Sequence, residues 1–195
     1  MRVLKEAMEN IVDHVSYVRS QLSDQQINKM IVSLEQAKKV YIYGAGRSGL
    51  VAKAFAMRLM HLGITVHVVG EITTPAIEAE DIFITISGSG ETTSVINSAK
   101  IAKNVGAQVI SITSYPDSTL GKLSDEIVLV PGRVIDPGSK DFHIRQIKGE
   151  HYTLAPMGTL FEVSVLIILD ALISELMTRL KKSESDLKKR HATIE

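Results

Sequence analysis

Two stretches decide the fold: VYIYGAGRSGLVAKAFAMRLM (residues 40–60) and DIFITISGSGETTSVINSAK (residues 81–100). In each, a run of β-branched and aromatic residues ends in a loop rich in glycine and serine, and a helical pattern follows. A strand, a glycine loop and a helix in this order are typical of a parallel sheet whose strands are connected by helices. Both loops are therefore expected at the carboxyl ends of strands, where open α/β sheets bind their ligands.

Three more strand-like runs extend this pattern along the chain: TVHVV (residues 65–69), QVISI (residues 108–112) and EIVLV (residues 126–130). Helices are expected at residues 48–62, 92–105 and 118–123, with two amphipathic helices before the first strand. The alternation predicts an α/β fold, a three-layer αβα sandwich with a five-stranded parallel sheet of flavodoxin-like or Rossmann-like type. We expect a single domain over residues 1–195, with N-terminal helices (1–37), an α/β core (38–180) and a polar C-terminal tail (181–195).

A long C-terminal helix is expected at residues 156–180, and it is apolar on nearly every face. A helix of this kind is buried, and in a chain this small we expect part of its surface to meet another subunit. Residues 131–152 lack periodicity and contain several glycines and prolines, so they are expected to form a long loop that could act as a lid.

The composition excludes several classes of function. Lysine plus arginine and aspartate plus glutamate both number 22, so the formal net charge is zero and no basic surface for nucleic acid is expected. Cysteine is absent, which excludes disulfides and thiolate chemistry. The N-terminal residues carry no signal-peptide core, and the most apolar stretch (residues 163–169) is shorter than the ~20 residues of a membrane span. We therefore expect a cytoplasmic protein with no membrane partner.

The first loop, GAGRSG (residues 44–49), matches the GxGxxG pattern between a strand and a helix. Gly46 and Gly49 would let backbone amides approach an anion, and Ser48 would add a hydroxyl. Glu71 lies about 20 residues after the pattern, where a dinucleotide-binding domain places its ribose contact. The first loop alone leaves a sugar phosphate and a nicotinamide dinucleotide as alternative ligands.

The second loop, SGSGET (residues 87–92), also connects a strand to a helix, although a dinucleotide fold needs only one such loop. Hydroxyl donors at the positive end of a helix can hold one phosphate group, and glycines keep the turn tight. The candidate phosphate ligands here are Ser87, Gly88, Ser89, Gly90 and Thr92. The alternative is a solvated turn in which Thr92 or Ser89 is only the N-cap of the next helix.

The motifs GAGRSG, GEITTPA, SGSGET and APMGTLFE together resemble the sugar isomerase (SIS) domain family. Within it, FAMRLMHLG and APMGTLFE are similar to the 6-phospho-3-hexuloisomerases. The resemblance implies a reversible conversion of D-arabino-hex-3-ulose 6-phosphate and D-fructose 6-phosphate in the ribulose monophosphate pathway of formaldehyde fixation, or its reverse. It also implies no redox cofactor and no metal, a dimer or tetramer, and 3-hexulose-6-phosphate synthase as a pathway partner.

Such an isomerisation requires a base that carries a proton between two carbons and a second group that serves the oxygens. Glu162 is the candidate base, because it lies in the first turn of the apolar C-terminal helix. The alternative is a capping box, in which Thr159 caps the helix and Glu162 bonds back to the backbone. The matching family motif carries this glutamate at its site, which favours the base.

Three further residues are catalytic candidates. His61 is expected near the end of the helix that follows the first loop, where it could simply complement the helix dipole beside Gly63. His191 lies in the polar tail, and SIS isomerases often deliver a C-terminal histidine into the site of a neighbouring subunit. Arg47, in the first loop, could stabilise an enediolate or the phosphate, or point to solvent.

Three other functions remain open at this point. The chain could be a SIS isomerase acting on another sugar phosphate, or a sugar-phosphate-binding module without catalysis. It could also be an NAD-binding domain, although the second loop argues against this. The histidines lack metal-ligand spacing, so no metal site is expected.

Overall fold

The computed structural model describes residues 1–132 and 154–193, so most of the expected loop at residues 131–152 lies outside the described residues. The strands are β1 (Val40–Gly44), β2 (Val66–Val68), β3 (Ile82–Ile86), β4 (Gln108–Thr113) and β5 (Glu126–Leu129). The helices are α1 (Arg2–Gln21), α2 (Asp24–Gln36), α3 (Arg47–Leu62), α4 (Thr93–Val105), α5 (Thr119–Leu123), α7 (Thr159–Arg179) and α8 (Glu184–Lys188). Every expected strand and helix is present, with ends that shift by up to three residues.

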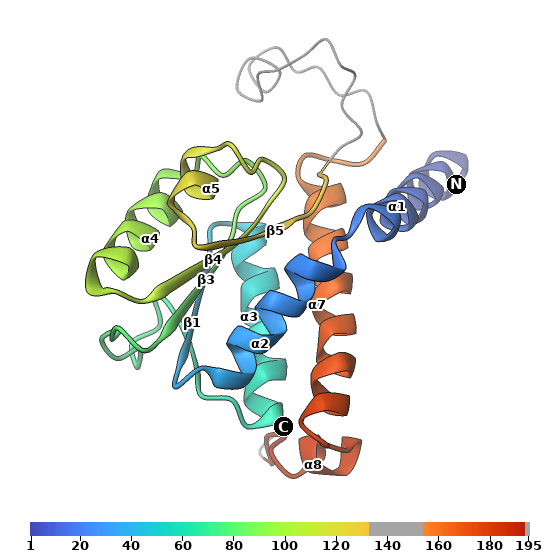
Figure 1. The fold of residues 1–195 in the computed structure, drawn as a ribbon. Coiled ribbons are helices and arrows are strands. Elements are labelled where there is room, and N and C mark those ends of the chain that lie inside the picture. The colour runs from blue at the N-terminus through green and yellow to red at the C-terminus, as the bar shows by residue number, and fades with distance from the viewer. Residues whose placement is uncertain (133–153, 194–195) are drawn as a thin grey trace.

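The five strands form one parallel sheet in the order β2-β1-β3-β4-β5. This order is flavodoxin-like and differs from the 3-2-1-4-5-6 order of the dinucleotide-binding folds. Side chains alternate between two cores, so that Ile42 faces α2, α3 and α7 whereas Tyr41 faces α4 and α5. Helices therefore cover both faces of the sheet (Figure 1). The predicted αβα sandwich is confirmed.

Helix α7 packs along α3 and buries one side of its surface, including Val165, Leu169 and Leu172. Another side of α7 is more open among the described residues, where Ile167 is 45% exposed. Helix α1 packs through its C-terminal half, and its N-terminal half projects from the body (Figure 1) with Leu4 exposed. Within residues 1–132 and 154–193, no helix combines the length and apolar character that a membrane span requires.

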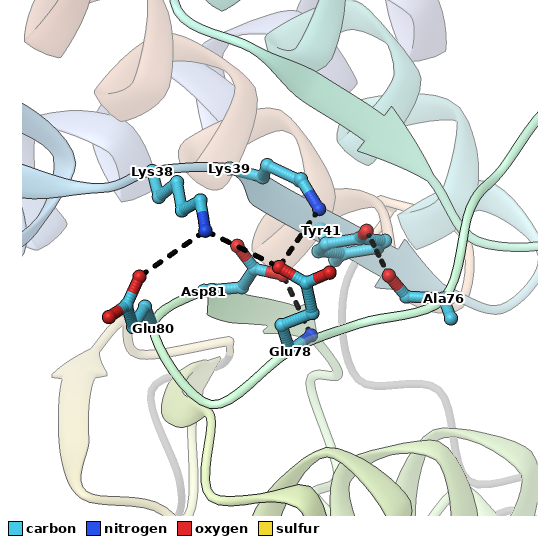
Figure 2. Close-up of polar contacts among 7 residues, drawn as sticks. All are labelled: Lys38, Lys39, Tyr41, Ala76, Glu78, Glu80 and Asp81. Carbon is cyan, nitrogen blue, oxygen red and sulfur yellow. Dashed lines mark hydrogen bonds and ion pairs between the residues drawn. The ribbon is translucent and has the colours of Figure 1, made fainter.

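A polar network lies at the amino edge of the sheet, where β1 and β3 begin. Figure 2 draws its members, which are Lys38, Lys39, Tyr41, Ala76, Glu78, Glu80 and Asp81. Lys38 pairs with Glu80 at 3.3 Å, and Lys39 pairs with Glu78 at 3.3 Å. A hydrogen bond from Lys39 holds the pKa of Glu78 below its usual value.

The same network anchors the connection between β2 and β3. The amide of Glu78 donates to the buried carboxylate of Asp81 at 2.8 Å, and the hydroxyl of Tyr41 donates to the carbonyl of Ala76 at 2.7 Å. These bonds satisfy polar groups that the connection would otherwise bury unpaired. The end of the β2–β3 connection is therefore held by hydrogen bonds within the chain.

Candidate functional site

The two glycine loops leave neighbouring strands at the same level of the sheet. Gly44 at the end of β1 lies opposite Ile86 at the end of β3, so both loops begin side by side. Gly46 has a φ of +57°, a conformation that favours glycine. A Cβ on Gly49 would lie 2.6 Å from the carbonyl oxygen of Gly44, so only glycine lets α3 start this close to β1. The sequence prediction that the loops meet at the carboxyl edge agrees with this register.

The first loop directs the N-terminus of α3 toward this edge. Gly46 is the N-cap, and the amides of Arg47 and Ser48 in the first turn have no acceptor within the helix. Ser48 is 9% exposed, and no hydrogen bond of its hydroxyl is recorded among the described residues. The amide of Gly49 bonds to the carbonyl of Gly46 at 3.0 Å and is therefore already occupied.

The second loop is ordered by its own hydroxyl groups. Ser87 Oγ accepts from the amide of Gly90 at 3.2 Å and lies 3.2 Å from the hydroxyl of Thr92. Ser89 Oγ accepts from the amide of Glu91, also at 3.2 Å. Thr92 is the N-cap of α4, as the alternative interpretation expected, but its hydroxyl makes no cap bond. The amides in the first turn of α4 thus have no acceptor within their helix.

Glu162 and Arg47, from opposite parts of the sequence, form an ion pair at this edge. The N-cap of α7 is Gly158, which makes no side-chain cap bond, so the capping box expected from Thr159 and Glu162 is wrong. Glu162 is the fourth residue of α7, one position after the residue that bonds back to the cap in a capping box. Its side chain is 12% exposed whereas that of Arg47 is 60% exposed, so a ligand would reach the guanidinium more easily.

Phe161 connects the start of α7 to the second loop. A Cβ on Gly88 would lie 3.0 Å from the Phe161 ring, so ring and loop are in close contact. The carbonyl of Gly88 also accepts from the amide of Ser114, at 3.2 Å. Sequence analysis did not single out Phe161 or Ser114, although the position of Phe161 beside Glu162 was an available signal. Three helix N-termini, those of α3, α4 and α7, thus lie around one edge.

His61 and His191 are brought together, but at the other end of α3. Their rings stack with centroids 5.3 Å apart and planes inclined at 26°. Because α3 rises 1.5 Å per residue, His61 lies about 21 Å along the helix from Arg47. The guanidinium of Arg190 lies against Gly63, which ends the helix in the αL conformation. Within one chain, these histidines and Glu162 do not meet.

Glu71, the expected ribose contact of a dinucleotide, pairs with Lys53 at 2.6 Å on the surface. Among the described residues, no three histidine, aspartate or glutamate side chains are grouped so that they could hold a metal ion.

Comparisons with known proteins agree with this geometry. The family model described as the SIS domain matches residues 33–140. A protein of Methanothermobacter thermautotrophicus without an assigned function is 46% identical over 100% of this chain and 98% of its own. The 3-hexulose-6-phosphate isomerase of Bacillus subtilis is 37% identical over 97% of this chain and 96% of its own.

Among solved structures, a Methanococcus jannaschii protein covers 100% of both chains at 35% identity with a TM-score of 0.76. For that protein, a molecular function of 3-hexulose-6-phosphate isomerase has been inferred from its crystal structure. The matched span includes both loops and the helices that follow them, and the chain belongs to the SIS domain family.

Proposed function

We propose that this protein is a sugar-phosphate isomerase that interconverts D-arabino-hex-3-ulose 6-phosphate and D-fructose 6-phosphate. The observation that carries the proposal is the Glu162–Arg47 ion pair beside two hydroxyl-rich loops, since it combines a base, a cation and an anion site. The substrate is proposed from relatives at 36–40% identity that are named 3-hexulose-6-phosphate isomerase. The reaction needs no redox cofactor, because one carbon is oxidised as its neighbour is reduced.

The phosphate group would bind between the loops. Ser48, Ser87, Ser89 and Thr92 would donate hydroxyls, and the glycines at 46, 49, 88 and 90 would keep the backbone close. The amides in the first turns of α3 and α4 add donors and the positive ends of two helix dipoles. The net charge of the chain is zero, so the attraction for a dianion would be local to this edge.

Glu162 would act as the base in a proton transfer between two carbons. It would remove the proton from C3 of fructose 6-phosphate, which leaves a 2,3-enediolate, and return a proton to C2 to give the 3-ketose. Arg47 would turn its exposed guanidinium to the enediolate oxygens, where a planar cation with several donors stabilises the developing charge. The ion pair would hold both groups ready before the sugar binds.

The second acid-base group would come from another copy of the chain. Because His61 lies about 21 Å from Arg47 along α3, neither it nor the stacked His191 can serve the same sugar as Glu162 within one subunit. An apolar groove of about 670 Å³ between α1, α2 and α7 supports self-association, as does the exposed Leu4 on α1. We therefore propose a homo-oligomer, a dimer or tetramer, with shared sites.

The test couples the protein to 3-hexulose-6-phosphate synthase, the proposed pathway partner. Fructose 6-phosphate is supplied and formaldehyde release is followed, with NAD titrated in parallel. Formaldehyde release without NAD binding is expected. Saturable NAD binding without turnover would favour a dinucleotide-binding domain, and sugar-phosphate binding without turnover would favour a module that only binds. Isomerisation of another sugar phosphate alone would assign a different SIS reaction.

Shared sites have a separate test by subunit mixing. Glu162→Gln and His61→Ala are each expected to be inactive, whereas hybrid oligomers formed from the two variants should regain activity in the sites that receive both intact residues. If hybrids form and stay inactive, the proposal that His61 acts across subunits is wrong.

A further inference from the structure

The second loop is supported by the connection between β4 and α5 as well as by its own hydroxyls. The amide of Leu120 donates to the carbonyl of Gly90 at 3.0 Å. One residue further on in the loop, a carboxylate oxygen of Glu91 accepts from the amide of Thr119 at 2.7 Å. A Cβ on Gly90 would lie 2.0 Å from Ser118 Oγ, so loop and connection are in direct contact.

These contacts give Glu91 a role that its position in the sequence does not predict. A glutamate beside a helix N-terminus is usually explained by the dipole of that helix. Here Glu91 precedes the N-cap Thr92, and its carboxylate reaches away from α4 to the start of α5. Thr119 is the first residue of α5, so its amide has no acceptor within that helix and Glu91 provides one.

We propose that Glu91 is a positioning residue that holds the second loop in the conformation that binds phosphate. This inference rests on the proposed function, because it assigns the phosphate group to the second loop. The carboxylate fixes the backbone directly between Gly90 and Thr92, which are candidate phosphate ligands. Without this bond, the loop must lose more conformational freedom when the sugar phosphate binds. The loop holds phosphate equally in substrate and transition state, so the loss appears in KM rather than in kcat.

The donor of this bond can be removed without changing Glu91. Thr119→Pro deletes the amide hydrogen, and proline is well tolerated at the first position of a helix. The preceding Ser118 has φ −64° and ψ 167°, an extended conformation that a following proline favours. Thr119→Ala keeps the amide and is the matched control. Glu91→Ala removes the acceptor, whereas Glu91→Gln keeps a carbonyl oxygen that can still accept.

The experiment measures kcat and KM for fructose 6-phosphate, and the binding of inorganic phosphate, in these variants and in the Glu91→Ala/Thr119→Pro double variant. We expect KM to rise about tenfold in Glu91→Ala and in Thr119→Pro with kcat nearly unchanged, since the bond involves a charged acceptor. The double variant should match the single ones, because both changes break one bond. Thr119→Ala should resemble wild type, and Glu91→Gln should recover most of the affinity.

The other possible outcomes separate the role of Glu91 from the proposed function. If the wild type turns over fructose 6-phosphate while folded Glu91→Ala and Thr119→Pro keep its KM, the role of Glu91 is wrong and the proposed function stands. Additive effects in the double variant would also overturn the role, since they would show two separate interactions. If the wild type neither binds phosphate nor isomerises the sugar, the proposed function fails, and the positioning role fails with it.

Discussion

The amino and carboxyl edges of the sheet use polar side chains in opposite ways. At the amino edge, Lys38 and Lys39 pair with glutamates, and Asp81 accepts from the amide of Glu78 (Figure 2). At the carboxyl edge, α3, α4 and α7 begin, and several amides in their first turns, including those of Arg47 and Ser48, have no acceptor within the helix. The pairs at the amino edge hold parts of the chain together, whereas under the proposed function the carboxyl edge provides donors for the sugar phosphate. Changes at the two edges should accordingly affect different properties.

The largest effect is expected from Glu162→Gln at the carboxyl edge. The amide has nearly the same shape but cannot take a proton, so kcat should fall by about 10³-fold, and binding of fructose 6-phosphate should change little. Steady-state kinetics and calorimetric binding measure the two properties. Asp170→Asn, on the same helix but paired with Arg58, is the control and should keep wild-type kcat. An active Glu162→Gln variant would remove Glu162 from the mechanism.

Arg47→Ala is expected to have the next largest effect. The variant loses the cation that would stabilise the enediolate and leaves Glu162 without its partner, so kcat/KM should fall by about 10²-fold. Arg47→Lys should recover only part of this loss, because an ammonium group lacks the planar donors of guanidinium. Equal activity in the alanine variant and the wild type would contradict a role for Arg47.

Ser87→Ala should change binding more than turnover. Its hydroxyl holds the amide of Gly90 and the hydroxyl of Thr92, so its removal loosens the second loop and also removes a candidate phosphate donor. We expect KM for fructose 6-phosphate to rise about tenfold with kcat within about threefold of wild type. Ser98→Ala, at a half-buried serine of α4 whose hydroxyl bonds to the carbonyl of Ser94 in the same helix, is the control. A fall in kcat with constant KM would show that Ser87 acts in the chemistry.

At the amino edge, Asp81→Ala should alter stability and leave catalysis unchanged. Asp81 is 1% exposed, and its removal leaves the amide of Glu78 without its acceptor. The free energy of unfolding should fall by about 1–3 kcal/mol, measured by urea denaturation. Kinetic constants at a temperature where the variant is folded should equal those of the wild type. A large loss of kcat in the folded variant would mean that the two edges are not independent.

The smallest effect concerns Glu126, also at the amino edge. Burial raises the pKa of Glu126, because the folded state disfavours its charged form. Protonated Glu126 therefore stabilises the folded state at acid pH relative to neutral pH, and this contribution is lost as the pH rises through the raised pKa. Glu126→Gln should therefore be more stable than wild type at pH 7, by at most about 1 kcal/mol. The advantage should vanish below pH 4.5, the ordinary value for this group, where wild-type Glu126 is protonated in both states. If the variant and the wild type differ in free energy of unfolding by the same amount at pH 7 and below pH 4.5, the raised pKa of Glu126 is not the cause.

The sheet and the two loops were predictable because local sequence determines them. Buried parallel strands are continuous apolar runs, and glycine and serine interrupt them where the backbone must turn. The distance from His61 to Arg47 was also available, since Arg47 directly precedes the helix predicted at residues 48–62 and the rise of a helix is known. These features depend on residues that are near one another in the chain.

The Glu162–Arg47 pair was not predictable, because it joins residues 115 positions apart. The capping-box alternative was wrong for a different reason. The start of α7 lies at Thr159 with Gly158 as its cap, and a difference of one residue decides whether Glu162 can bond back to the cap. The hydrogen bond between Glu91 and the amide of Thr119 likewise depends on how the second loop packs against the β4–α5 connection. A local sequence pattern does not predict this packing.

The most direct test of the central claim follows hydrogen exchange at single carbons of fructose 6-phosphate. The protein is incubated with the sugar in D₂O, and deuterium incorporation is located by NMR for the wild type and for Glu162→Gln. If Glu162 forms a 2,3-enediolate, deuterium should enter at C3 with the wild type and should not enter there with the variant. Deuterium at C1, or exchange at C3 that persists in Glu162→Gln, would contradict the account.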